Sequence, residues 1–224
     1  MTDTMTIDHD TMPDTKSCHV VINVETLVSI NSIMNFGDTS ANPTASALAG
    51  VSLVRDGESV LRVYATNRYV LARATYFNSV NFDSWDVGEK LWLDHKTLKQ
   101  AVAIAKNHKQ AVITIGYDTD RRVFVDVDGN KLFNVLGQPS YPNVAALFDD
   151  DTTPNGADVI RINPRWLALL SKVITPTTRQ NKDLPWMLSF FHDTESKKPK
   201  PMLATLEDTD WNISVLIQPN LIVR

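Results

Sequence analysis

Residues 90–136 read KLWLDHKTLKQAVAIAKNHKQAVITIGYDTDRRVFVDVDGNKLFNVL, and their pattern changes from strand to helix and back to strand. The apolar run Leu91–Leu93 ends at Asp94, a residue type that often caps helix N-termini. A helix over about residues 95–107 is predicted next, because apolar residues recur there at helical spacing. These residues are Leu98, Ala101, Val102 and Ala105.

Three short strands are predicted after this helix, over residues 111–115, 122–127 and 131–136. Asp128-Gly129 separates the last two strands, and this dipeptide is the strongest short signal for a hairpin turn. Residues 88–137 are therefore predicted to form one β-α-β-β-β unit.

The same order of elements precedes this unit. A strand over 19–24 leads into a helix that begins near Glu25 and ends near Gly37. The apolar positions of that helix are Leu27, Ile30, Ile33 and Met34. Strands over 48–55, 60–65 and 69–76 complete the unit, which spans residues 18–77.

The order occurs once more after it, over residues 158–224. A strand at 159–162 is followed by Asn163 as N-cap and Pro164 at the first helical position. The helix carries Leu167, Leu170 and either Val173 or Ile174, and strands over 186–192, 202–206 and 211–217 follow. Three such units indicate internal duplication and an α+β fold. Residues 18–148 would form a domain of two units, 149–157 a linker, and 158–224 half a domain.

Composition narrows the class of protein. A chain of 224 residues can bury a core without cross-links, and the single cysteine, Cys18, excludes an internal disulfide framework. Residues 1–17 are predicted to be a disordered acidic tail, and no apolar run approaches the ~20 residues that span a bilayer. A cytoplasmic protein is the simplest interpretation. A net charge of −4 argues against nucleic acid bound on all sides, although not on one.

Four separated segments resemble the bacterial sliding clamp, the β subunit of DNA polymerase III. Residues 65–72, ATNRYVLA, are similar to the family's ATDGHRLA, with Arg68 and Val70 as departures. Leu48-Ala49-Gly50-Val51 resembles the family's Leu-Asn-Gly-Met. Tyr141-Pro142-Asn143 resembles its aromatic-Pro-Asp/Asn segment, and Leu216-Ile217-Gln218-Pro219-Asn220 resembles its Val-Val-Met-Pro-Met ending.

The resemblance implies a DNA-clamp fold, with antiparallel sheets outside and helices on a DNA-facing side. It implies a non-enzymatic processivity factor, in a shortened form such as a phage could encode, acting in a bacterial or phage-infected cell. Its partners would be duplex DNA without sequence preference, a DNA polymerase and other replication proteins that carry short linear motifs, and a clamp loader. No cofactor, metal or membrane is implied. Bacterial clamps have six units per chain and this chain has three, so a closed tetramer, an open dimer and a monomer all remain open.

Basic residues on two predicted helices are the candidates for DNA contact. Lys96, Lys99 and Lys106 project from one side of the second helix, opposite its apolar face. Arg165 and Lys172, seven residues apart, form a shorter stripe on the third. The first helix offers no cation on its polar side, which carries Ser29, Ser32 and Asn35. A solvated helix face is the alternative interpretation.

The resemblance also implies a pocket for partner peptides. The matching positions are Leu48, Thr66, Tyr69, Val70, Leu71, Pro142, Leu147, Leu216 and Pro219. Alternatively, several of the apolar members are ordinary core residues of strands.

Two other functions remain as alternatives. One is a clamp-fold adaptor that binds partner peptides without encircling DNA. The weaker one is a metal-dependent phosphoryl hydrolase that uses Asp-rich turns such as Asp149-Asp150-Asp151. Consecutive carboxylates in an extended segment point apart, and no nucleophile or phosphate-loop motif is found in the sequence.

Overall fold

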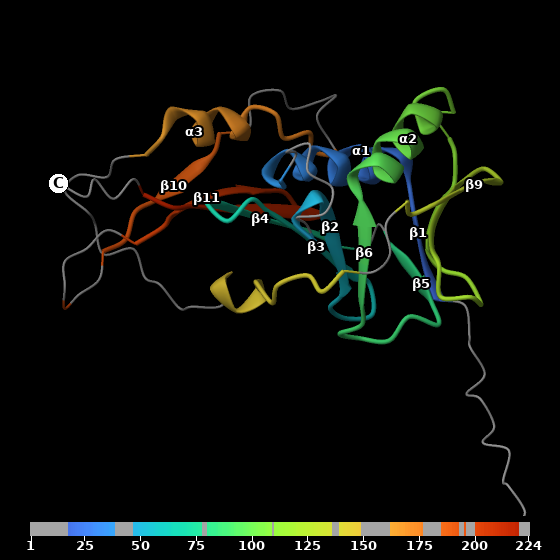
Figure 1. The fold of residues 1–224 in the computed structure, drawn as a ribbon. Helices are drawn as coiled ribbons and strands as arrows, with labels where there is room; N and C mark the ends of the chain where they lie inside the picture. Colours follow the sequence, from blue (N-terminus) through green and yellow to red (C-terminus); the bar gives the residue numbers. More distant parts are fainter. Residues whose placement is uncertain are drawn as a thin grey trace, which may run out of the picture.

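The computed structural model describes residues 18–38, 47–77, 80–108, 110–135, 139–148, 162–176, 185–192, 195 and 200–219. The predicted tail 1–17, the linker 149–157 and most of the predicted strand 159–162 lie outside these residues. Two antiparallel sheets form the body of the protein, and three helices lie along one side of them (Figure 1). The predicted α+β fold with antiparallel sheets is confirmed.

The smaller sheet has five strands. Their order is β5 (Asn81–Asp83), β1 (Cys18–Ile22), β7 (Ile113–Tyr117), β8 (Val123–Val127) and β9 (Asn130–Phe133). The larger sheet has seven strands. Their order is β10 (Met187–Ser189), β11 (Met202–Glu207), β12 (Trp211–Ile217), β4 (Val70–Phe77), β3 (Val60–Thr66), β2 (Gly50–Arg55) and β6 (Lys90–Asp94).

The first two units exchange their opening strands. β1 of the first unit pairs with β7 of the second, and β6 of the second pairs with β2 of the first. Their helices, α1 (Val24–Ile33) and α2 (His95–Ala105), pack against each other. Because each sheet needs a strand from the other unit, the two units share one core.

The third unit joins the first through a seam between β12 and β4. Seven residue pairs are in register along it, from Trp211 opposite Tyr76 to Ile217 opposite Val70. Side chains alternate between faces along a strand. Val70 and Ile217 belong to the core under the helices, so their neighbours Leu71 and Leu216 lie opposite each other on the outer face of the sheet.

Polar caps fix where each helix begins. Asn23 accepts a hydrogen bond from the Thr26 amide at 2.8 Å, and Asp94 accepts one from the Thr97 amide at 2.7 Å. Asn163 caps α3 (Pro164–Leu170) by accepting from the Arg165 amide at 3.0 Å, with Pro164 in the first turn. Both N-caps that the sequence predicts, Asp94 and Asn163, are confirmed.

Several predicted boundaries are wrong. The strand expected at 111–115 runs over Ile113–Tyr117, and the strand expected at 186–192 is only Met187–Ser189. The helix expected to reach 107 ends at Ala105, so Lys106 is its C-cap. α3 ends at Leu170 and buries Leu169 and Leu170, whereas Leu167, expected on the buried face, is 38% exposed.

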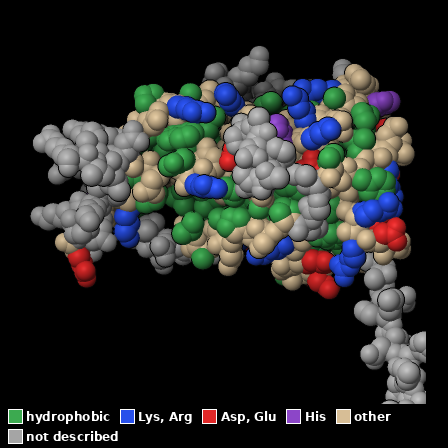
Figure 2. Space-filling view, in the orientation of Figure 1, with side chains coloured by type: hydrophobic (Ala, Val, Ile, Leu, Met, Phe, Trp, Pro, Cys, Tyr) green, Lys and Arg blue, Asp and Glu red, His purple; other side chains and the backbone are tan. Residues whose placement is uncertain are grey.

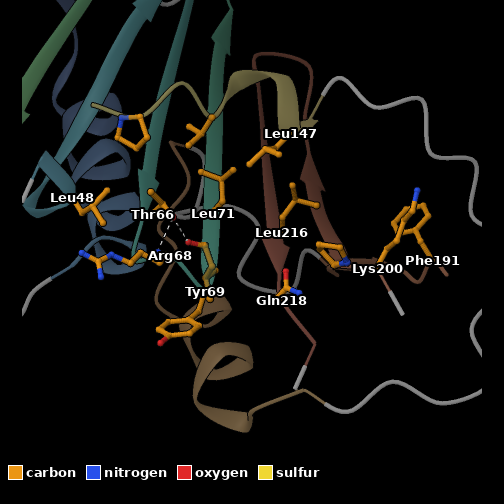
Figure 3. A pocket seen from close by; sticks show the side chains of 14 residues that line it. Leu48, Thr66, Arg68, Tyr69, Leu71, Leu147, Phe191, Lys200, Leu216 and Gln218 are labelled. Carbon is orange, nitrogen blue, oxygen red and sulfur yellow. Dashed lines mark hydrogen bonds between the residues drawn. The ribbon is translucent and has the colours of Figure 1, made fainter. Parts of the chain in front are cut away.

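The segment predicted as strand 48–55 begins with a short 3-10 helix, η3 (Ala47–Ala49), and the strand starts only at Gly50. Gly50 lies against the Trp92 ring, where a Cβ atom would be 2.4 Å from Cε2. A glycine at this position lets β2 approach β6 closely. Leu48 consequently precedes the strand and reaches the outer face of the sheet (Figure 3).

Candidate functional site

A cavity of about 690 Å³ lies over the β4–β12 seam. Its floor includes Leu71 and Leu216, which face each other across the seam, and Leu48 borders it (Figure 3). Pro142 also lines the cavity. Residues of the first unit, the segment 142–147 and the third unit all contribute to its lining. The cavity therefore exists only where the third unit meets the first.

The structure brings together all the predicted pocket residues except Pro219. Pro219 is buried but does not line the cavity, where Gln218 takes its place. The sequence did not predict Arg68, Val144, Phe191, Lys200, Pro201 or Gln218 as lining residues. Arg68 could have been found, since it lies inside a matched segment. Phe191 and Lys200 carry no motif, because only the pairing of the third unit with the first places them here.

A tight turn at residues 67–69 forms one end of the cavity. The Asn67 side-chain oxygen accepts from the Tyr69 amide at 3.1 Å and from the Val70 amide at 3.0 Å. The Thr66 hydroxyl accepts from the Arg68 amide at 3.1 Å and donates to the Val70 carbonyl at 2.8 Å. These bonds hold Arg68 at a φ of +78°, a conformation that few residues other than glycine adopt.

Tyr69 connects this turn to the third helix. Its ring stacks on Trp166 of α3, with centroids 5.8 Å apart and an angle of 15° between the planes. Arg165 lies over the Trp166 ring, with its guanidinium carbon 5.4 Å from the ring centroid. Tyr69 is 61% exposed despite this contact, so its ring is available at the rim of the cavity.

The wall opposite the seam is the short 3-10 helix η4 (Ala145–Phe148). Phe148 attaches it to the outer face of the sheet, because Arg73 lies over its ring at 4.5 Å and the Tyr64 ring is 6.3 Å away. Leu147 lines the cavity and is 60% exposed. An apolar side chain that is exposed and faces a cavity is available to a ligand.

Burial divides the predicted pocket residues into two groups. Leu48, Val70 and Leu71 are 8%, 1% and 6% exposed, so their side chains also support the fold. Tyr69 and Leu147 protrude. A mutation of the first group would change both stability and binding. Leu147 tests binding alone, whereas a mutation of Tyr69 would also remove its stacking on Trp166.

The basic residues that the sequence proposes for DNA contact are all exposed. Lys96 and Lys99 lie on α2, Lys106 caps its C-terminus, Arg165 lies on α3, and Lys172 lies just beyond α3. Figure 1 shows α3, α1 and α2 in a row on one side of the sheets, with η4 on the other side. Cationic side chains are visible along the helix side of the surface in Figure 2. Burial and the neighbouring Lys99 charge lower the pKa of His95, so the positive charge of α2 comes from its lysines.

The interpretation of the first helix was wrong in one respect. Ser29 and Ser32 do not form an exposed polar side, since they are 0% and 2% exposed. The Tyr76 hydroxyl donates to Ser29 Oγ at 2.9 Å, and Ser32 Oγ accepts from the Ile174 amide at 2.9 Å. These serines connect α1 to β4 and to the third unit.

Within the part of the chain that the structure describes, no group of three His, Cys, Asp or Glu residues could hold a metal ion. None of the described helices is long and apolar enough to cross a membrane.

The sheet order, the strand exchange and the row of helices define the DNA-clamp fold, and the chain is similar to solved structures of that class. A Eubacterium rectale protein described as a DNA polymerase III β subunit superposes with a TM-score of 0.58 at 14% identity, over 97% of this chain and 69% of that chain. The Pseudomonas aeruginosa sliding clamp gives 0.57 at 12% identity, over 96% and 69%. A. fulgidus PCNA, solved with the C-terminal region of FEN-1, gives 0.51 at 9% identity, over 92% and 100%. The sequence matches no protein-family model and no curated protein.

Proposed function

We propose that this chain is a non-enzymatic processivity factor that holds a DNA polymerase on duplex DNA in a bacterial or phage-infected cell. One observation carries the proposal: exposed cations lie on the helices at one side of the sheets, and an apolar cavity opens over the seam on the outer face. DNA and a partner protein could therefore bind at the same time. The clamp fold, shared with β subunits and PCNA, supports this arrangement.

The helix side suits a protein that must slide. Lys96, Lys99 and Lys106 offer flexible ammonium groups, which attract phosphates without reading bases. Such contacts are individually weak and exchange easily, and salt weakens them because bound counterions are released on association. Sequence-independent, salt-sensitive binding is the expected behaviour.

The cavity suits a short linear motif. Two or three apolar side chains buried in it would each contribute about 1.5–3 kcal/mol, less the cost of ordering the peptide. Affinities around micromolar are expected, which would let polymerases and other replication proteins exchange. A partner is known for a protein of this fold, since PCNA was solved with the C-terminal region of FEN-1.

Charge reversal on the helix side tests the DNA role. Lys96→Glu with Lys99→Glu should reduce binding to duplex DNA by at least tenfold at low salt, with little change in stability, because both side chains are exposed. Lys90→Glu with Lys131→Glu is the matched control: it makes the same change in net charge, and both residues alternate with core residues, which places them on the outer sheet face. Equal losses in the two variants would reduce the effect to net charge and contradict the proposal.

A clamp-fold adaptor that binds partner peptides without encircling DNA is the second candidate. It is favoured by the net charge of −4 and by α1, whose residues include no cation. The adaptor would be supported if the protein bound peptides and if neither double lysine variant changed its binding to DNA. A clamp loader and further copies of this chain would be partners only of a processivity factor. One chain of three units would need other chains to surround a duplex.

A further inference from the structure

The two ends of the cavity carry positive charge. Figure 3 shows Arg68 at one end and Lys200 beside Phe191 at the other, with Leu71 and Leu216 between them. No Asp or Glu is among the described residues that line the cavity. Neither Arg68 nor Lys200 makes an ion pair with any other described residue. The site is therefore an apolar floor between two cations to which the described residues supply no counter-charge.

This local charge is opposite in sign to that of the whole chain. With a net charge of −4, the protein should repel an acidic ligand at long range. Screening limits that repulsion to about 10 Å at ordinary salt, so within the cavity the two nearby cations dominate. Preference for acidic groups here would arise from Arg68 and Lys200.

The backbone that carries these cations is held in place before any ligand arrives. Arg68 belongs to the turn fixed by the Thr66 and Asn67 side chains, and the Gln218 amide donates to the Tyr69 carbonyl at 3.0 Å. The Lys200 amide donates to the Phe191 carbonyl at 2.9 Å. Such preorganisation lowers the entropy cost of binding.

We propose that the partner of this cavity is a peptide whose apolar residues are flanked by carboxylates, one meeting Arg68 and the other meeting Lys200. The inference rests on the proposed peptide-binding function and specifies its ligand. Each rim-exposed ion pair adds only a small preference, of about twofold to fivefold. Two pairs together should favour acidic over neutral flanks by roughly tenfold at low salt, and less at high salt.

Three fluorescent ten-residue peptides test the proposal, each with the same core of two leucines and a phenylalanine and with Glu, Gln or Lys at both flanks. Titrated against the full chain, the Glu-flanked peptide should bind about tenfold more tightly than the Gln-flanked peptide, and the Lys-flanked peptide most weakly. In the double variant Arg68→Glu/Lys200→Glu this order should reverse, with the Lys-flanked peptide binding most tightly and the Glu-flanked peptide most weakly. The double variant Lys90→Glu/Lys131→Glu, with the same change in net charge, should keep the original order.

The outcomes separate this inference from the function on which it rests. Equal binding of all three peptides to the parent protein would overturn the acidic preference and leave the cavity as a peptide site. Binding of none of them at millimolar concentration would overturn both. A reversed order in the Lys90→Glu/Lys131→Glu control would assign the preference to net charge and overturn the role of Arg68 and Lys200. Peptides with a single Glu flank, measured in Arg68→Glu and Lys200→Glu separately, would then give the direction in which the peptide lies.

Discussion

Asp94 is the residue that connects α2 to the rest of the second unit. Its carboxylate is buried and accepts from the Thr97 amide at 2.7 Å, the Thr97 hydroxyl at 3.0 Å and the Val135 amide at 2.7 Å. Loss of the carboxylate would leave two buried or partly buried amides unpaired. Asp94→Ala should therefore lower the free energy of unfolding by about 2–3 kcal/mol. Urea denaturation measures this directly.

Asn163→Ala provides the comparison for Asp94. Asn163 caps the shorter helix α3 with one described side-chain hydrogen bond, to the exposed Arg165 amide. Its replacement should cost about 1 kcal/mol or less. Equal losses for the two variants would mean that the additional contacts of Asp94 contribute nothing to stability.

Leu147 tests the cavity at the scale of one side chain. Because it is 60% exposed and lines the cavity, Leu147→Ser should weaken binding of an apolar peptide by about tenfold, the loss expected for one partly buried leucine. Its melting temperature should stay close to that of the parent. Val87→Ser, at a site that is 64% exposed and remote from the lining, is the control. Unchanged peptide affinity in Leu147→Ser would remove the cavity from the proposed function.

At the scale of elements, η4 depends on one aromatic side chain for its position. Phe148 touches Arg73 and Tyr64 but does not line the cavity, so it acts by positioning Leu147. Phe148→Ala should lower peptide affinity by about fivefold, since the wall must then be ordered on binding. Phe133→Ala is the matched control, because Arg122 lies over Phe133 at 4.6 Å in the other sheet. Equal effects of the two substitutions would contradict a positioning role for Phe148.

The sequence predicted those elements whose signals are local. α2 combines a cap with a regular apolar spacing, and the hairpin at Asp128-Gly129 is confirmed with both residues at positive φ. β5 was missed because Asn81–Asp83 is only three residues long, too short for its alternation to stand out, and its place is fixed by pairing with β1. Burial of Ser29 and Ser32 was also missed, since their partners Tyr76 and Ile174 lie far away in the chain.

The cavity residues likewise divide into those that the sequence could predict and those that only tertiary structure places there. Residues from matched segments of the first unit, such as Leu71 and Thr66, could be placed there from the sequence. Phe191 and Lys200 could not, because their proximity depends on the register between β12 and β4, which no local pattern specifies. The resemblance could place Leu71, Thr66 and Arg68 at the cavity, whereas Lys200 at its other end is placed only by tertiary structure.

At the scale of the whole molecule, we propose that the third unit is half of a domain. In the first unit, β2 pairs with β6 of the second unit. In the third unit, β10 occupies the place that corresponds to β2, and it is the edge of the described sheet. Met187, Leu188 and Phe190 at this edge are 54%, 44% and 36% exposed. An apolar sheet edge of this kind favours association with another chain.

We therefore expect the mass in solution to rise with concentration above the 25.1 kDa of one chain. Replacing Met187 and Leu188 with lysine should shift the equilibrium back to monomer, because charged residues block edge pairing. Light scattering over a hundredfold range of concentration measures both. A parent protein that stays at the mass of one chain throughout would contradict association through β10.

Retention on DNA with blocked ends tests the central claim most directly. The protein is allowed to thread onto a linear duplex that is biotinylated at both ends, streptavidin is then added to half of the sample, and both halves are passed through a gel-filtration column at moderate salt. A processivity factor that surrounds the duplex should stay with the end-blocked DNA and be lost from the open-ended DNA. Equal retention on both, or equal loss from both, would contradict encirclement.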